Sequence, residues 1–347
     1  MHIAGAAASR IRNMRILEFR RKETIMTFED AAYCNAAENK RAYRAGKKRI
    51  AFVFIASCIS IALINLCSEP IIWLYRRIYH AFFNGASTDT YYLGFEIVIF
   101  SLSLFVPFLI WMLACGERFC NAFPLRPRLT RKPVGYIMFV IGICMIVTLV
   151  LNLLFPWYNE VFGSEPYEFT EPTDIVLYFL FVALTPAIFE EFAFRGVCIT
   201  CLRPLGTRFA VVVSAAIFGL MHISPIQCLF AFLFGLLAGA AYVSTGSVWT
   251  GVVIHFFNNA ISVLAEYGNT PVLVIISIIM YGSMIYSVIY LIRAIRYPRK
   301  TPLFVRERQE KLLTGSGYTA TRALLTSPFP YVFLLLVGAS MIERYFS

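Results

Sequence analysis

The sequence is poor in charged residues for its length. Only 15% of its 347 residues are Asp, Glu, Lys or Arg, whereas 59% are hydrophobic. A soluble globular domain carries about 25% charged residues. This shortage excludes an ordinary soluble enzyme, and repeated apolar runs of roughly 20 residues predict a helical protein that crosses a membrane several times.

The sequence also lacks the cysteine framework of a secreted, disulfide-bonded protein. Its nine cysteines are scattered, mostly in apolar runs, and Cys198-x-x-Cys201 is the only close pair. A zinc site there would need two more ligands at a suitable spacing, and the neighbouring sequence has none. We interpret the cysteines as buried free thiols. The N-terminus has no apolar core of a cleavable signal peptide, so we expect the first span to be retained.

The net charge of +11 does not indicate a nucleic-acid partner, because the basic residues gather beside apolar segments. Residues 1–49 hold twelve Lys or Arg, and residues 293–313 hold seven. Charges placed in this way set membrane topology. We therefore expect no nucleic acid as a partner, and an integral, multi-pass protein of the plasma membrane with a cytoplasmic N-terminus.

The predicted fold is an all-α, polytopic transmembrane bundle of about eight spans, at about 50–67, 91–115, 134–155, 174–202, 208–223, 226–243, 248–264 and 271–292. A stretch of fourteen residues, 329–342, is short for a crossing and is read as a ninth span or an interfacial helix. We divide the chain into a basic cytoplasmic arm (1–49), a transmembrane domain (50–292) with its motif core at 174–265, and a basic cytoplasmic tail (293–347).

The fourth span carries three charged residues in its interior, Glu190, Glu191 and Arg195. Charges inside a membrane cost a few kcal/mol each and normally mark a functional site. Glu191 and Arg195 are four residues apart, so on a helix they share a face and can form an ion pair. Glu190 lies about 100° away around the helix and is the freer carboxylate. For Glu96, in the second span, we expect a structural role.

Two further pairs lie at a spacing of four residues, Phe218-x-x-x-His222 in the fifth span and His255-x-x-x-Asn259 in the seventh. A carboxylate and a histidine in a confined wet pocket can share a water molecule and take its proton. A second histidine and an asparagine can supply N–H donors to a developing oxyanion. No Ser or Cys lies in a nucleophile-like setting, so direct attack by water is favoured.

Helix rise argues against one shared site. At 1.5 Å per residue, Glu190 and His255 fall about 5–10 Å from the cytoplasmic boundary, whereas His222 falls about 20 Å deep. A tilted helix, or one that starts later, would remove this mismatch. In the sixth span, Ala231, Gly235 and Gly239 recur every four residues and predict a smooth face for close helix packing.

Together the three motifs, in this order and on separate spans, resemble the CPBP family. These are the CAAX-protease and bacteriocin-processing membrane peptidases, related to the type II CAAX prenyl endopeptidases. The resemblance covers about residues 174–265. It implies an intramembrane endopeptidase that acts on a membrane-associated or lipidated peptide in the lipid bilayer.

The resemblance also assigns roles. Glu190 and His222 would activate water, His255 and Asn259 would form the oxyanion hole, and the supporting residues would be Glu191, Arg195 and Phe218. It favours glutamate-type chemistry without a cofactor. The alternative is a zinc metalloprotease, in which Glu190, His222 and His255 would hold the metal, although the usual His-Glu-x-x-His helix is absent.

Two other functions stay open at this point. A non-catalytic scaffold or bacteriocin-immunity protein of the same fold would bind a peptide without cutting it. A secondary transporter could also use a Glu–His chain as a proton relay. Transporters often have internal repeats, and the sequence shows no convincing one.

Overall fold

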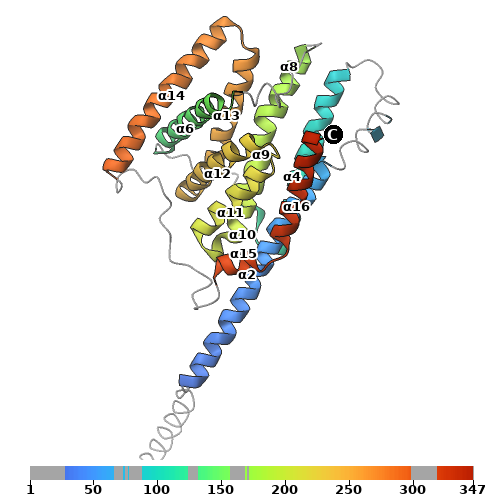
Figure 1. The fold of residues 1–347 in the computed structure, drawn as a ribbon, viewed down its shortest axis with the longest axis vertical. Helices are drawn as coiled ribbons and strands as arrows, with labels where there is room; N and C mark the ends of the chain where they lie inside the picture. Colours follow the sequence, from blue (N-terminus) through green and yellow to red (C-terminus); the bar gives the residue numbers. More distant parts are fainter. Residues whose placement is uncertain are drawn as a thin grey trace, which may run out of the picture.

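A computed structural model of the chain describes residues 28–65, 73–74, 77, 88–123, 132–156, 169, 172–297 and 319–346. The regular structure of these residues is helical, and they contain no β-strand (Figure 1). This confirms the predicted all-α class. Several helices are long and apolar enough to cross a membrane, and the chain is a multi-pass integral membrane protein.

Six candidate spans occur in the described residues: Leu93–Ala114, Val134–Leu154, Asp174–Leu205, Pro225–Thr245, Val248–Tyr267 and Thr270–Arg296. They coincide with six of the eight predicted spans. The predicted span 208–223 corresponds to a shorter helix, α11 (Thr207–Leu220). The predicted span 50–67 corresponds to the C-terminal part of α2 (Phe28–Asn65), which is not among the six candidates.

One long helix, broken into segments, runs through the middle of the bundle (Figure 1). Its segments are α8 (Pro172–Phe179), η1 (Leu180–Leu184), α9 (Thr185–Glu190), η2 (Glu191–Ile199), α10 (Thr200–Leu202) and η3 (Arg203–Leu205). All nine residues of η2 are buried. The helices packed against η2 are α4 (Thr88–Ala114), α5 (Phe119–Ala122), α11, α12 (Pro225–Thr245) and α13 (Val248–Tyr267). The outer helices α6 (Lys132–Leu154) and α14 (Thr270–Arg296) pack against each other and against α13.

Two segments of the central helix, η1 and η2, are π-helical, with hydrogen bonds that reach back five residues. At the end of η1, for example, the Thr185 N–H donates to Leu180 O. Such wide turns are rare in proteins, and those that occur are often found at functional sites. Pro186, just beyond η1, has no N–H to donate, so the regular hydrogen-bond pattern is interrupted beside Glu190.

The small residues of α12 allow it to pack closely against α11. A Cβ added at Gly235 would lie 2.9 Å from the Cβ of Ala215, and one at Gly239 would lie 2.9 Å from Cγ1 of Val211. Both distances are shorter than a van der Waals contact, so larger residues would force the helices apart. The predicted packing face of the sixth span is confirmed.

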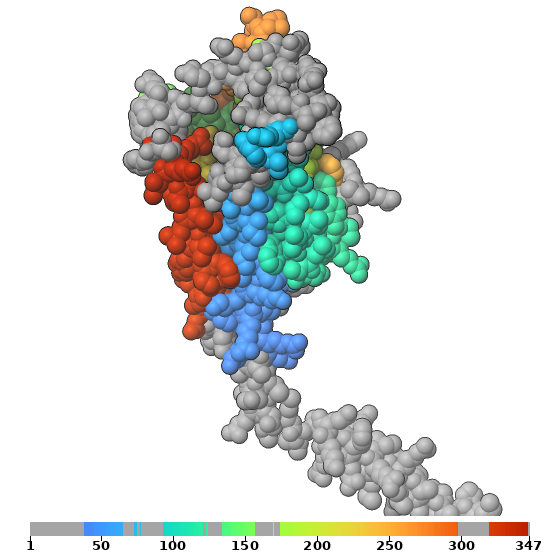
Figure 2. Space-filling view, turned by 90° about the vertical axis from the view of Figure 1, so that its right-hand side faces the viewer, coloured from blue at the N-terminus to red at the C-terminus, as the bar shows by residue number. Residues whose placement is uncertain are grey.

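The C-terminal part of the chain returns to its beginning, through α15 (Ala320–Leu325) and α16 (Phe329–Phe346). Both helices pack against α2, and α16 lies beside it on the surface (Figure 2). Phe333 of α16 is fully buried, with its ring centroid 5.7 Å from that of Phe54. The stretch predicted as a ninth span or interfacial helix, 329–342, is therefore a helix that packs on the bundle, and it is not among the six candidate spans.

Candidate active site

Glu191 and Arg195 form a fully buried ion pair within η2. Nη1 of Arg195 lies 2.8 Å from Oε1 of Glu191, and the two side chains are 1% and 0% exposed. This confirms the pairing predicted from their spacing. Gly251 of α13 makes room for the carboxylate, because a Cβ at this position would overlap Oε2 of Glu191.

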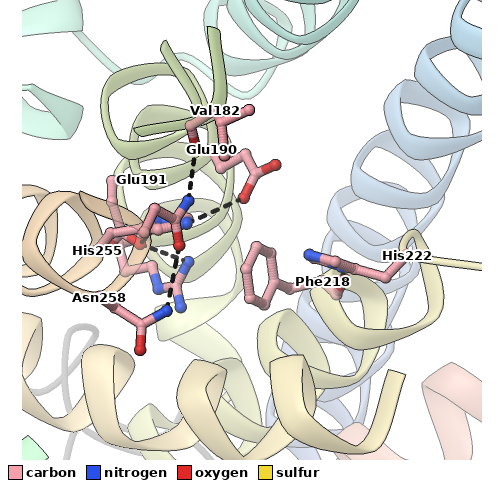
Figure 3. Close-up of polar contacts among 9 residues, drawn as sticks. Val182, Glu190, Glu191, Phe218, His222, His255 and Asn258 are labelled. Carbon is pink, nitrogen blue, oxygen red and sulfur yellow. Dashed lines mark hydrogen bonds and ion pairs between the residues drawn. The ribbon is translucent and has the colours of Figure 1, made fainter. Parts of the chain in front are cut away.

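The same carboxylate oxygen of Glu191 also holds His255. Nδ1 of His255 lies 3.1 Å from Oε1 of Glu191, and Nε2 lies 3.6 Å from Oε2 of Glu190 (Figure 3). A carboxylate can only accept a hydrogen bond, so Nδ1 carries a proton. Glu191 therefore neutralises Arg195 and also sets the orientation of the His255 ring. The sequence does not indicate this second contact, because it joins two different spans.

Glu190 faces away from the buried pair, as its position on the helix predicts. Its side chain is 13% exposed, whereas that of Glu191 is 0% exposed. Oε2 of Glu190 is buried and has no hydrogen-bond partner among the described residues. A buried polar atom without a partner is costly and usually belongs to a site that binds water or a ligand.

The predicted span 208–223 placed His222 inside a helix, and this was wrong. His222 lies in the turn after α11. The helix ends at Leu220, and Nδ1 of His222 lies 2.9 Å from the carbonyl oxygen of Phe218. Since a carbonyl only accepts, the hydrogen-bonded Nδ1 carries the proton and the neutral ring keeps Nε2 as its basic nitrogen. Ile223 follows with φ of 62°, a left-handed conformation that is strained for a β-branched residue.

The predicted difference in depth between Glu190 and His222 was wrong. The central helix continues to Leu205, and α11 begins at Thr207 and runs back along it. Fifteen residues separate Glu190 from Leu205, and fifteen separate Thr207 from His222. At 1.5 Å per residue both side chains lie about 20 Å from this turn. The error lay in the distance from Glu190 to the end of its span, because even the predicted end, Leu202, lies twelve residues, or about 18 Å, beyond Glu190.

Asn259 is held by two hydrogen bonds. Its Nδ2 donates to Val182 O at 2.9 Å, and its Oδ1 accepts from Nδ2 of Asn258 at 3.1 Å (Figure 3). The Val182 carbonyl can accept from Asn259 because Pro186, four residues later, has no N–H to offer it. These two bonds fix the orientation of the amide and leave the second Nδ2–H of Asn259 for a ligand.

Phe218 lies between the two histidines (Figure 3). Its ring centroid is 4.9 Å from that of His222 and 6.1 Å from that of His255, with both rings edge-on. On the same ring, Cζ of Arg195 lies 4.5 Å from the centroid. A second aromatic ring, Phe234, lies 5.0 Å from the ring of His255. These rings shield the ion pair from water and favour the cation electrostatically.

A single cavity of about 660 Å³ brings the predicted residues together. Its lining includes Glu190, Phe218, His222, His255, Asn259 and Arg344. Glu191 and Arg195 are not part of the lining; they support it from behind. Glu190 and His222 both line this cavity, and no hydrogen bond or ion pair joins them directly.

The residues expected to hold a zinc ion do not form a ligand set in this arrangement. In the part of the chain that the structure describes, no three His, Cys, Asp or Glu side chains are grouped closely enough to share a metal. His255 uses Nδ1 for Glu191, and His222 contacts Phe218 rather than Glu190 or His255.

A comparison with protein families found a match to part of the chain. Residues 172–261 match the type II CAAX prenyl endopeptidase Rce1-like family. The match contains all three motifs and confirms the resemblance seen in the sequence. It supports, at the level of the family, a CAAX-type intramembrane protease. A search of curated proteins found no match, and a search of solved structures found none either.

Three features of the site were not found from the sequence. Two of them lie within the Rce1-like segment: the contact between Glu191 and His255, and the carbonyl of Val182 that holds Asn259. The third is Arg344, which lies outside that segment and still lines the cavity. The sequence carries no signal for Arg344, because a basic residue near the end of an apolar helix is common at membrane boundaries.

Proposed function

We propose that this protein is an intramembrane endopeptidase that hydrolyses a peptide bond of a membrane-associated or lipidated peptide. The observation that carries the proposal is the cavity shared by Glu190, His222, His255 and Asn259. The name of the matching family supports a prenylated CAAX peptide as the substrate. The basic residues of 1–49 support a cytoplasmic N-terminus, and we place the protein in the plasma membrane as part of the proposal.

In the proposed mechanism, a water molecule binds between Oε2 of Glu190 and Nε2 of His222. Glu190 takes one proton of the water as its oxygen attacks the carbonyl carbon of the scissile bond, while His222 accepts a hydrogen bond from the other. The proton on Glu190 then passes to the leaving nitrogen, and the carbon–nitrogen bond breaks. One water is consumed, and a carboxylic acid and an amine are released.

The free Nδ2–H of Asn259 and the Nε2 nitrogen of His255 supply the oxyanion hole. Because Glu191 engages the proton on Nδ1, Nε2 of His255 can donate only when the ring carries two protons. That charge is matched, since His255 and Arg195 together would face two carboxylates, Glu190 and Glu191. Each preorganised donor of this kind contributes roughly 10²–10³-fold in rate.

The proposal is of a glutamate-type peptidase, and no step of it needs a metal. Activity of the purified protein is therefore expected to survive treatment with a strong chelator. Loss of activity with the chelator, restored by added zinc, would favour the metalloprotease alternative instead.

The decisive experiment is comparative peptidomics of cells that carry the wild-type protein, Glu190→Gln or Glu96→Gln. Glu96 is the matched control, because it is a half-buried carboxylate of α4 that does not line the cavity. We expect cleavage products with the wild type and the control and none with Glu190→Gln. Identical peptide profiles for wild type and Glu190→Gln at equal expression would contradict proteolysis and favour a scaffold or immunity role.

A further inference from the structure

The C-terminal helix α16 contributes a residue to the cavity. Arg344 lies in its last turn and is part of the cavity lining, together with Glu190 and His255. The family match ends at residue 261, so this helix lies outside the segment that carries the motifs. The site is therefore built from more of the chain than its motifs indicate.

Arg344 is the permanent cation of this cavity. The other ionisable residues in the lining are Glu190 and the two histidines, whereas Arg195 lies behind the lining and is paired with Glu191. Arg344 is exposed and makes no hydrogen bond or ion pair with any described residue. The cavity thus has an acid–base region and, separately, an unpaired guanidinium.

Packing anchors the helix that carries Arg344. Phe333 and Val337 of α16 are 0% and 3% exposed. Before the helix begins, Nζ of Lys47 donates to Thr326 O at 2.8 Å, and the Tyr43 hydroxyl lies 2.9 Å from Oγ1 of Thr326. The guanidinium is therefore presented by an anchored helix, which reduces the entropic cost of using it to bind a ligand.

We propose that Arg344 binds a carboxylate of the peptide substrate and so determines which peptides the site accepts. A guanidinium presents a planar fork of donors that matches a carboxylate in two hydrogen bonds. A sphere with the volume of this cavity, about 660 Å³, would be about 11 Å across, which is the length of roughly three residues of extended chain. A peptide could therefore reach Arg344 with a carboxylate a few residues beyond the bond that Glu190 hydrolyses.

This proposal rests on the proposed function, and the carboxylate has two sources. It is either the free C-terminus of the peptide or the side chain of an Asp or Glu. An alternative role for Arg344 is purely structural, because a basic residue in the last turn of a helix is favoured by the helix dipole. Only the first role depends on the charge of the ligand.

The experiment uses the purified full-length protein and three fluorescent S-farnesyl peptides with the same sequence up to their last residue. One ends in a free carboxylate, one in a carboxamide, and one in a carboxamide preceded by Glu. Cleavage and equilibrium binding are measured for the wild type, Arg344→Gln and Arg344→Lys. Arg296→Gln serves as the control, since Arg296 is also in the last turn of a helix and does not line the cavity.

With the wild type we expect KM for the free-acid peptide to be about tenfold lower than for the plain carboxamide, as one charged hydrogen-bonded pair provides. Arg344→Gln should remove this difference by raising KM for the acid, with kcat unchanged, and Arg344→Lys should restore part of it. If the Glu-containing carboxamide binds as well as the acid, a side chain is an equally good source of the carboxylate; if it does not, the C-terminus is the source.

The inference is overturned if Arg344→Gln leaves the preference for the acid intact, or if it changes all three peptides equally while the protein stays folded. Failure of the proposed function gives a different result. A wild-type protein that cleaves no peptide but binds the acid more tightly than the carboxamide through Arg344 would contradict proteolysis and still support the carboxylate site.

Discussion

The carboxylate of Glu191 connects the central helix to His255 of α13, with Oε1 3.1 Å from Nδ1. The same oxygen lies 2.8 Å from Nη1 of Arg195. The second carboxylate of the diacidic motif is therefore more than the counter-ion of a buried arginine. It transmits the position of one helix to a histidine on another, which lies next to Glu190.

Removing the guanidinium of this group should destabilise the protein strongly. In Arg195→Met, Glu191 would be left buried without its cation, at a cost of roughly 3–5 kcal/mol. The midpoint of unfolding in detergent, followed by circular dichroism, should fall clearly. The double variant Glu191→Leu/Arg195→Met should recover much of this stability and stay inactive, because nothing then holds His255. A fully active double variant would show that this orientation is unimportant.

Gly251 should tolerate no side chain, because a Cβ would overlap Oε2 of Glu191. We expect Gly251→Ala to displace the carboxylate and to lower kcat about 10- to 100-fold, as is usual for residues that orient a catalytic histidine. Peptide cleavage by the purified variants measures this effect. The control is Gly282→Ala in α14, where an added Cβ meets nothing within 4 Å. Equal activity of the two variants would contradict the argument.

Asn259→Ala removes the proposed oxyanion donor. The expected result is a fall in kcat of roughly 10²–10³-fold with little change in KM, because the donor acts on the transition state more than on the bound peptide. Steady-state kinetics separates the two parameters. A rise in KM at constant kcat would instead mean that Asn259 only binds the substrate.

Pro186→Ala tests why Asn259 is held where it is. An alanine at this position has an N–H that can donate to Val182 O and compete with Nδ2 of Asn259. We expect kcat to fall, by less than in Asn259→Ala, although helix propensity improves and the protein is at least as stable. Kinetics and thermal unfolding of the same preparation check both statements. Unchanged kcat would show that the Val182 carbonyl does not depend on the proline.

Contacts within one helix could be predicted from the spacing of the residues, whereas contacts between different helices could not. The four-residue spacing was enough to predict the pair Glu191–Arg195, because both members belong to one helix. It also placed His255 and Asn259 on one face, and both line the cavity. The contact between Glu191 and His255 joins residues 64 apart in the chain, and helix periodicity carries no information about such a distance.

The number and ends of the helices were harder to predict for a different reason. The apolar run that contains α11 looks like a full span, but the helix has only 14 residues and the chain turns after Leu220, through the left-handed Ile223. Apolar composition alone does not mark this turn. The π-helical segments could not be predicted from the sequence either, since no residue type distinguishes them from an α-helix with the same pattern.

The π-helical turns of η2 make the number of residues in this segment part of the design of the site. Removing one residue while the remaining turns keep their form would rotate Glu190 by about 100° relative to everything that follows Ile199. Glu190 would then lose its phase with His222 and Asn259, even though every one of these side chains is still present. Chain length within η2 is therefore constrained separately from the identity of its residues.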